Sequence, residues 1–193
     1  MRPLINTVLV TAAVAAICLA GASPALAAGP WKGQVVDEET GQPLEGVVVL
    51  FYWLKDSGTL ATSHGGTEFY DAEEVVTGPD GRFVIPSRRI FTLLPWKHFI
   101  RQIVIFKPGY GQWAFQGLRD PQNLPYSQYE ARRDEAEKQL EHDGVVVTLP
   151  LLNTKEQRLD FLRQVSWALV PSNLTQRMRA AKDAERIYLG LGD

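Results

Sequence analysis

The sequence predicts a mainly β protein with added α-helices, on two observations. Residues 31–110 hold short runs rich in valine, isoleucine and aromatic residues, and stretches containing glycine and proline separate these runs. After Pro150 the apolar residues recur three and four positions apart, which is typical of amphipathic helices. The chain has 193 residues, of which 45% are hydrophobic and 22% charged. A chain of this size and composition can bury a core without disulfides.

Residues 1–27 have the pattern of a secretory signal peptide. Arg2 precedes a nearly uninterrupted apolar run, and Ala25-Leu26-Ala27 has the small-x-small form of a cleavage site. We expect cleavage after Ala27 and export to the periplasm or the exterior of a bacterial cell, with no stable transmembrane segment afterwards. The alternative is an uncleaved anchor, although the apolar run falls short of the roughly 20 residues that span a bilayer. Cleavage removes Cys18, the only cysteine.

The mature chain contains six predicted strands and one ambiguous one. The six, each rich in β-branched or aromatic residues, are 31–37, 47–54, 74–77, 82–86, 101–106 and 145–149. Residues 90–94 are the ambiguous candidate, because Pro95 would interrupt a strand there. Residues 55–71 are polar and are predicted to form a long loop. Residues 78–81, with the sequence Gly-Pro-Asp-Gly, predict a tight turn in which proline fixes φ and glycine supplies a positive φ.

Helices are predicted in an insertion and at the C-terminus. The insertion covers about residues 111–144, and its helix is expected over 127–141. Residues 151–193 form a C-terminal extension of two helices. Asn153 and Glu156 have capping-box spacing ahead of a helix that reaches about Leu169. A second helix opens with Asn173 and Gln176, and Gly190 and Gly192 end it.

Two predicted strands lack the alternation of a half-exposed strand. Residues 47–54 and 103–106 are apolar almost without interruption, so both faces of these strands should be covered. One face can meet a second sheet. The apolar stripes of the C-terminal helices suit the other face, so we expect both helices to pack on the outside of one sheet.

Three motifs in order over residues 32–110 resemble the carboxypeptidase regulatory-like domain. The first is a Gly-Val-rich strand and turn, the second a Thr followed by Asp-Gly-x-Phe, and the third a Gly-Tyr after a strand. Their residues here are Gly33, Val35, Val36, Asp37, Thr40, Gly41, Pro43, Leu44, Gly46, Val47, Thr77, Asp80, Gly81, Phe83, Gly109 and Tyr110. The resemblance implies a seven-stranded, two-sheet sandwich of the transthyretin type over residues 28–150, serving as a non-catalytic module. The chain departs from the pattern in a longer 87–100 segment, in the insertion and after Pro150.

Charge and motif content exclude several functions. After cleavage the chain has 19 basic against 22 acidic residues, a net charge of −3, which argues against a general nucleic-acid binder. The three histidines, His64, His98 and His142, do not have metal-site spacing, and no G-x-S-x-G nucleophile motif is present. We therefore expect no enzyme activity, no metal and no cofactor.

Loop aromatics and a basic cluster are the candidate binding residues. Trp96, Tyr110 and Trp113 lie in predicted loops, where aromatic rings can stack on sugars. Arg88 and Arg89 suit an anionic partner, and the alternative for them is a solvated loop balanced by nearby acids, Asp71, Glu73 and Glu74. The sequence favours an exported, non-catalytic cell-envelope module that binds another protein or helps envelope assembly. A partner could extend the edge strands of such a sandwich. A carbohydrate-binding module using the loop aromatics and a small hydrolase with an unrecognised site are the alternatives.

Overall fold

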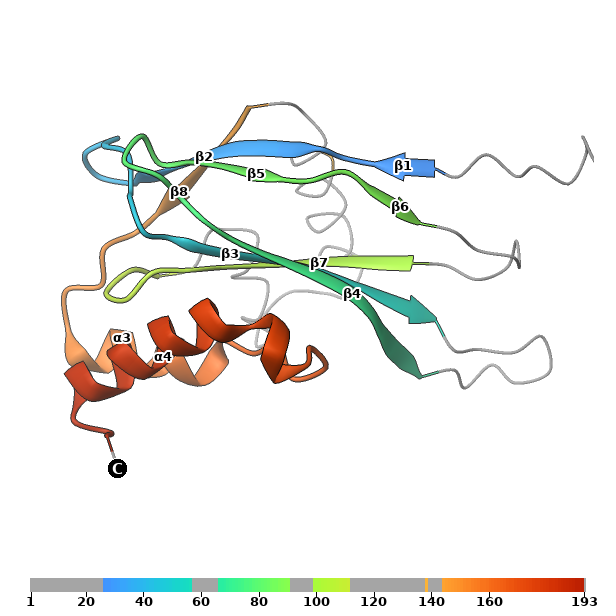
Figure 1. The fold of residues 1–193 in the computed structure, drawn as a ribbon. Helices are drawn as coiled ribbons and strands as arrows, with labels where there is room; N and C mark the ends of the chain where they lie inside the picture. Colours follow the sequence, from blue (N-terminus) through green and yellow to red (C-terminus); the bar gives the residue numbers. More distant parts are fainter. Residues whose placement is uncertain (1–25, 57–65, 91–98, 112–137, 139–143, 193) are drawn as a thin grey trace, which may run out of the picture.

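The computed structural model describes residues 26–56, 66–90, 99–111, 138 and 144–192. Within these ranges the chain forms eight strands, two α-helices and one short 3-10 helix (Figure 1). The strands make two three-stranded sheets and one two-stranded sheet. The prediction of a mainly β fold with added C-terminal helices is therefore confirmed.

The first sheet has the order β5-β2-β8. Its central strand β2 (Trp31–Asp37) pairs antiparallel with β5 (Arg82–Ile85) and parallel with β8 (Val145–Leu149). The two short strands β1 (Leu26–Ala28) and β6 (Arg88–Ile90) precede β2 and follow β5, and they form a separate antiparallel pair. The predicted bounds of β2 and β8 agree with the structure, and those of β5 agree to one residue.

The second sheet has the order β4-β3-β7 and is antiparallel throughout. Its strands are β3 (Val48–Asp56), β4 (Thr67–Val76) and β7 (Phe99–Phe106). The prediction of a loop over 55–71 is wrong at both ends, because β3 and β4 stay paired out to Asp56 and Thr67. The start of β4 is polar because most of its side chains remain at least partly exposed, so its composition resembles that of a loop.

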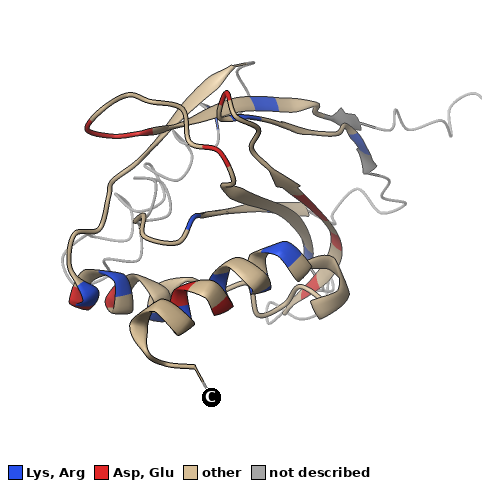
Figure 2. Cartoon of the chain, turned by 60° about the vertical axis from the view of Figure 1, so that its left-hand side comes forward, with Lys and Arg blue, Asp and Glu red and all other residues tan. Residues whose placement is uncertain are grey.

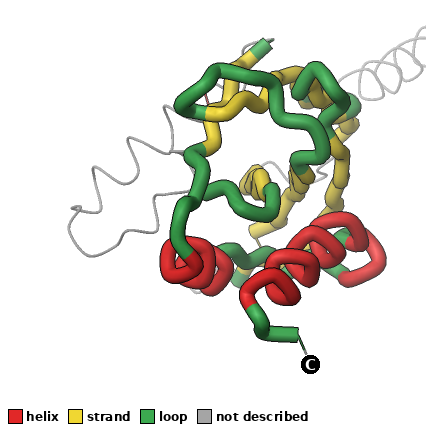
Figure 3. Tube along the Cα trace, turned by 90° about the vertical axis from the view of Figure 1, so that its left-hand side faces the viewer, coloured by secondary structure: helices red, strands yellow, loops and turns green. Residues whose placement is uncertain are grey.

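Strand β3 contributes to two separate hydrophobic clusters, one on each face. Val49, Phe51 and Trp53 pack with apolar residues of the first sheet. Leu50 and Tyr52, on the opposite face, pack with residues of the C-terminal helices. The prediction that both faces are covered is confirmed. The second sheet therefore lies between the first sheet and the helices, which occupy one side of the strands (Figures 1 and 3).

The first C-terminal helix, α3 (Lys155–Gln164), is shorter than predicted. Its N-cap is Thr154 rather than Asn153, and the capping box is completed by Gln157 rather than Glu156. The helix ends at Gln164 because Val165 adopts an extended conformation, with φ −67° and ψ 117°, and is buried against the second sheet. The predicted continuation to Leu169 is therefore wrong.

The second helix, α4 (Gln176–Leu189), follows the 3-10 helix η2 (Ser172–Leu174). Its N-cap residue makes no side-chain capping bond. Instead, the carboxylate of Glu74 in β4 accepts the backbone N–H groups of Arg177 at 2.9 Å and Met178 at 2.6 Å. These bonds satisfy two free donors of the first turn and place a negative charge at the positive end of the helix dipole. The helix ends at Gly190, as predicted, with φ 77°.

Some predictions fall on residues that the structure does not describe. These include the apolar core of the signal sequence and, apart from a helical Lys138, the predicted insertion helix. The predicted cleavage point after Ala27 lies inside β1. In the part of the chain that is described, no helix combines the length and apolar character needed to cross a bilayer.

Candidate functional site

The structure describes only part of the set of binding residues predicted from the sequence. Trp96 and Trp113 lie outside the described residues, and so do all three histidines. Arg89 lies in β6, where its backbone pairs with Ala27, but its side chain is not described. Only Arg88 and Tyr110 have described side chains, and each has partners of its own.

Arg88 is held by two carboxylates of β4. Its guanidinium forms an ion pair and hydrogen bond with Glu73, and its Nε lies 3.4 Å from Asp71 Oδ2. The third acid considered from the sequence, Glu74, instead caps α4. This arrangement matches the alternative in which nearby acids balance Arg88.

Tyr110 belongs to a structural cluster with Asp37. Its backbone forms an isolated bridge with Leu151, and its half-buried side chain hydrogen-bonds the Asp37 carboxylate. Burial, reinforced by the negative charge of Asp37, raises the pKa of Tyr110. Asp37 also accepts hydrogen bonds from the backbone N–H groups of Glu39 at 3.0 Å and Thr40 at 2.8 Å. The backbone and side-chain hydrogen bonds from Thr40 are the main reason that the pKa of Asp37 is lowered below its ordinary value.

The lowered pKa of Asp37 predicts a contribution to acid sensitivity. Because the carboxyl binds its proton less tightly in the folded chain, its stabilising effect is complete above the unfolded pKa and is lost as the pH falls through the folded pKa. We expect Asp37→Asn to be less stable than the parent at pH 6, but to lose less further stability between pH 5 and pH 2. Urea unfolding across this range measures both effects, and an unchanged acid profile in the variant would contradict the assignment.

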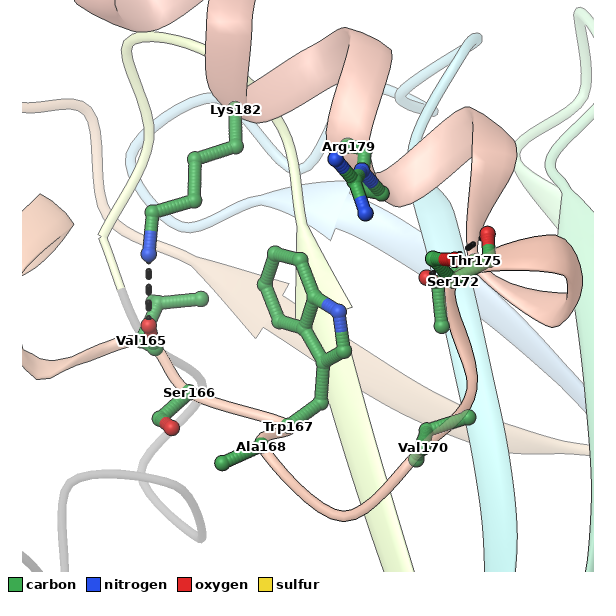
Figure 4. Close-up of a pocket in the computed structure, with 9 residues that line it drawn as sticks. All are labelled: Val165, Ser166, Trp167, Ala168, Val170, Ser172, Thr175, Arg179 and Lys182. Carbon is green, nitrogen blue, oxygen red and sulfur yellow. Dashed lines mark hydrogen bonds between the residues drawn. The ribbon is translucent and has the colours of Figure 1, made fainter.

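A pocket of about 320 Å³ lies between α4 and the connection from α3 to α4 (Figure 4). Four exposed residues, Ser166, Ala168, Ser172 and Arg179, lie along it, so the pocket is open to solvent. The other lining residues are Val165, Trp167, Val170, Thr175 and Lys182. Val165 and Val170 are buried and belong to the cluster that packs the helices on the second sheet, so the pocket has a fixed apolar base.

Lys182 and Trp167 form the centre of this pocket. The ammonium group of Lys182 donates a hydrogen bond of 2.9 Å to the backbone oxygen of Val165, and it lies 5.1 Å from the centre of the Trp167 ring. Partial burial lowers the pKa of Lys182, and the charge of Arg186 adds to this effect, whereas Asp183 opposes it. The bond to Val165 also holds the segment after α3 against α4, so the lysine helps to shape the pocket that it lines.

Arg179 supplies a second cation. It is exposed on α4, one turn before Lys182, and the indole of Trp167 lies between the two basic side chains (Figure 4). Among the described residues its guanidinium has no hydrogen-bond or ion-pair partner. Among the described residues that line it there is no acidic side chain and no histidine. The pocket is therefore a positively charged site with hydroxyl groups and one aromatic ring.

The helix that carries both cations is fixed to the sheets by a nearly buried ion pair. Glu185 of α4 accepts two hydrogen bonds from the Arg158 guanidinium, one of them 2.6 Å long from Nε. The same carboxylate accepts the backbone N–H of Gly109, in the turn after β7, at 3.0 Å. Glu185 thus connects α4 to α3 and to the end of β7, so Arg179 and Lys182 project from an anchored helix.

Sequence reasoning did not identify the residues of this pocket. Trp167 fell within the predicted helix that was expected to reach Leu169, whereas the actual helix ends three residues before it. The available signals were the β-branched Val165 and the polar Ser166 near Pro171, which together favour an earlier helix end. Arg179 and Lys182 lie within the second predicted helix, and no motif in the sequence distinguishes them as binding residues.

Within the described ranges, no three His, Cys, Asp or Glu side chains gather in a way that could hold a metal ion. Comparisons with protein-family models, curated protein sequences and solved structures found no match to this chain in any of the three.

Proposed function

We propose that this protein is a non-catalytic module of the bacterial cell envelope, exported through its signal peptide, that binds another protein. We further propose that its two three-stranded sheets belong to a seven-stranded sandwich of the transthyretin type, as in the carboxypeptidase regulatory-like domain. The motifs quoted above support this fold, and so does the hydrophobic cluster that the two three-stranded sheets share. The helical extension after Pro150 then provides the surface that is specific to this chain.

The single observation that carries the proposal is the open pocket on this extension. Trp167, Arg179 and Lys182 present an aromatic ring and two cations at a surface with a buried apolar base. Aromatic residues and arginine are enriched where proteins bind one another. The Lys182 side chain and the backbone of α4 are also held in place before binding, because Lys182 is bonded to Val165 and α4 is anchored through Glu185. A pre-organised site loses less entropy on binding.

Catalysis receives less support from this pocket. In the part of the chain that the structure describes, its lining offers neither a carboxylate nor an imidazole to act as a general base. The remaining candidate, Lys182, already donates a hydrogen bond to a backbone carbonyl. A hydrolase would need a further acid or nucleophile at this place.

Carbohydrate binding is the second candidate function, and Trp167 is the observation that favours it. This ring is partly exposed and lies beside the hydroxyl groups of Ser166 and Ser172, and an aromatic face with neighbouring hydroxyls suits a sugar ring. A glycan array that detects a defined sugar, with the signal lost in Trp167→Ala, would favour this function over protein binding.

Site-specific photo-crosslinking in the intact envelope tests protein binding. A photoreactive phenylalanine analogue replaces Ser166 at the pocket, and in a matched control it replaces Glu39, which is exposed in the turn after β2. We expect a discrete protein adduct from position 166 that is absent from position 39. The proposal fails if the folded, exported chain gives no adduct from position 166, or if both positions give the same adducts.

A further inference from the structure

We propose that the pocket binds a glutamate or aspartate side chain from an extended acidic segment of the partner protein. Arg179 takes the carboxylate, Lys182 adds a second positive charge, and Trp167 contacts the apolar residue beside it. This inference rests on the proposed protein-binding function and adds the chemistry of the ligand.

The charge of the site selects an anion. The described lining residues include two cations and three hydroxyl side chains but no acid. Helix α4 carries four basic and two acidic residues, although the complete chain has a net charge of −2. One of the two acids, Glu185, is paired with Arg158, so its charge does not offset the basic residues on the helix surface. Figure 2 shows where the basic and acidic residues lie along the C-terminal helices. Asp183 remains as the acid next to Lys182, and its charge offsets only part of this excess.

The two cations differ in what they can still bind. Lys182 uses one donor on the backbone oxygen of Val165 and lies over the indole ring, so its position is fixed. Arg179 has a full set of donors without a partner among the described residues. A planar guanidinium can grip a carboxylate through two parallel hydrogen bonds, which an ammonium cannot do. Arg179 is therefore the group that recognises the carboxylate, and Lys182 adds to the positive electrostatic potential at the place where the carboxylate binds.

Size and lining favour a peptide over a large polyanion. A volume of about 320 Å³ lies at the lower end of the range for ligand pockets and holds one or two side chains. Ala168, Val170 and the ring of Trp167 supply apolar surface beside the cations. An acidic residue next to an apolar one matches this combination, whereas a phosphate polymer would leave the apolar surface unused.

Peptide titration against the full mature chain tests the inference. The probes are a capped Gly-Glu-Leu-Glu-Gly peptide and the same peptide with glutamine in place of both glutamates, measured by calorimetry at 50 mM and 300 mM salt. We expect the glutamate peptide to bind at least 10-fold more tightly at low salt, and this advantage to shrink at high salt. Arg179→Gln should remove most of the advantage. Arg177→Gln, which changes an exposed arginine of the same helix outside the pocket lining, should retain it.

Three results would overturn the inference: equal affinity for the two peptides, equal losses in Arg177→Gln and Arg179→Gln, or inorganic phosphate binding more tightly than the glutamate peptide.

The crosslinking experiment separates this inference from the proposed function. A partner captured at position 166 equally well with and without Arg179→Gln rejects the acidic ligand and leaves protein binding in place. Selective binding of the glutamate peptide without any captured partner supports the carboxylate site and rejects the proposed function.

Discussion

Replacing Arg158 with methionine is expected to lower the free energy of unfolding by about 3 kcal/mol. The side chains of Arg158 and Glu185 are only 14% and 3% exposed, so water screens their interaction poorly. Methionine keeps much of the apolar volume but leaves the Glu185 carboxylate buried with only the N–H of Gly109 as a described partner. An uncompensated buried charge of this kind is costly. The substitution also removes the cation–π contact in which Arg158 lies 3.6 Å from the centre of the Tyr188 ring.

The matched control for Arg158→Met is Arg163→Met in the same helix. Arg163 pairs with Asp160 at 3.6 Å, but the two side chains are 69% and 67% exposed. Exposed pairs contribute at most about 1 kcal/mol, so this variant should unfold near the parent in urea. A loss for Arg158→Met as small as that for Arg163→Met would mean that the Arg158–Glu185 pair does not fix the helices to the sheets.

Contacts between residues that are distant in sequence explain why part of the fold was beyond sequence-based prediction. Local patterns predicted β2, β8 and the end of α4 at Gly190, because the signals lie within the elements themselves. Glu74 is different, since its carboxylate caps a helix about 100 residues further along the chain. No local signal indicates such a cap, so the sequence places Glu74 only in a predicted strand and among the acids near Arg88.

The candidate site was also beyond sequence-based prediction, because it depends on contacts between residues that are distant in sequence. Each aromatic chosen from the sequence was chosen because it lay in a predicted loop, and Tyr110 proved to be half-buried beside Asp37. Trp167 was passed over because its segment has helical spacing. The burial of Val165 ends that helix early, and this burial depends on the second sheet, which is distant in sequence. The apolar character of 47–54 predicted that helices would cover the sheet, but not the pocket that their connection forms.

Replacing Gly81 with alanine is expected to lower the free energy of unfolding by at least about 3 kcal/mol, which combines backbone strain with overpacking. Gly81 has φ 70°, and a β-carbon there would lie 2.4 Å from the backbone oxygen of Val35 and 3.1 Å from the backbone nitrogen of Leu44. The Gly81 oxygen also accepts the N–H of Val35 at 2.8 Å. Moving the turn away to relieve the clash would therefore break a bond at the centre of the first sheet.

Gly41→Ala separates these two contributions. Gly41 has a similar φ of 67°, but a β-carbon there would meet no atom within 4 Å. Its cost should be limited to about 1–2 kcal/mol for a non-glycine residue in the left-handed region. Urea unfolding of both variants should place Gly81→Ala clearly below Gly41→Ala. Equal losses would show that the turn moves without strain and that the close approach of Gly81 to Val35 does not hold β2 and β5 together. A larger loss of unfolding free energy for Gly81→Ala would instead show that the Asp-Gly turn can pack against β2 only because Gly81 has no β-carbon.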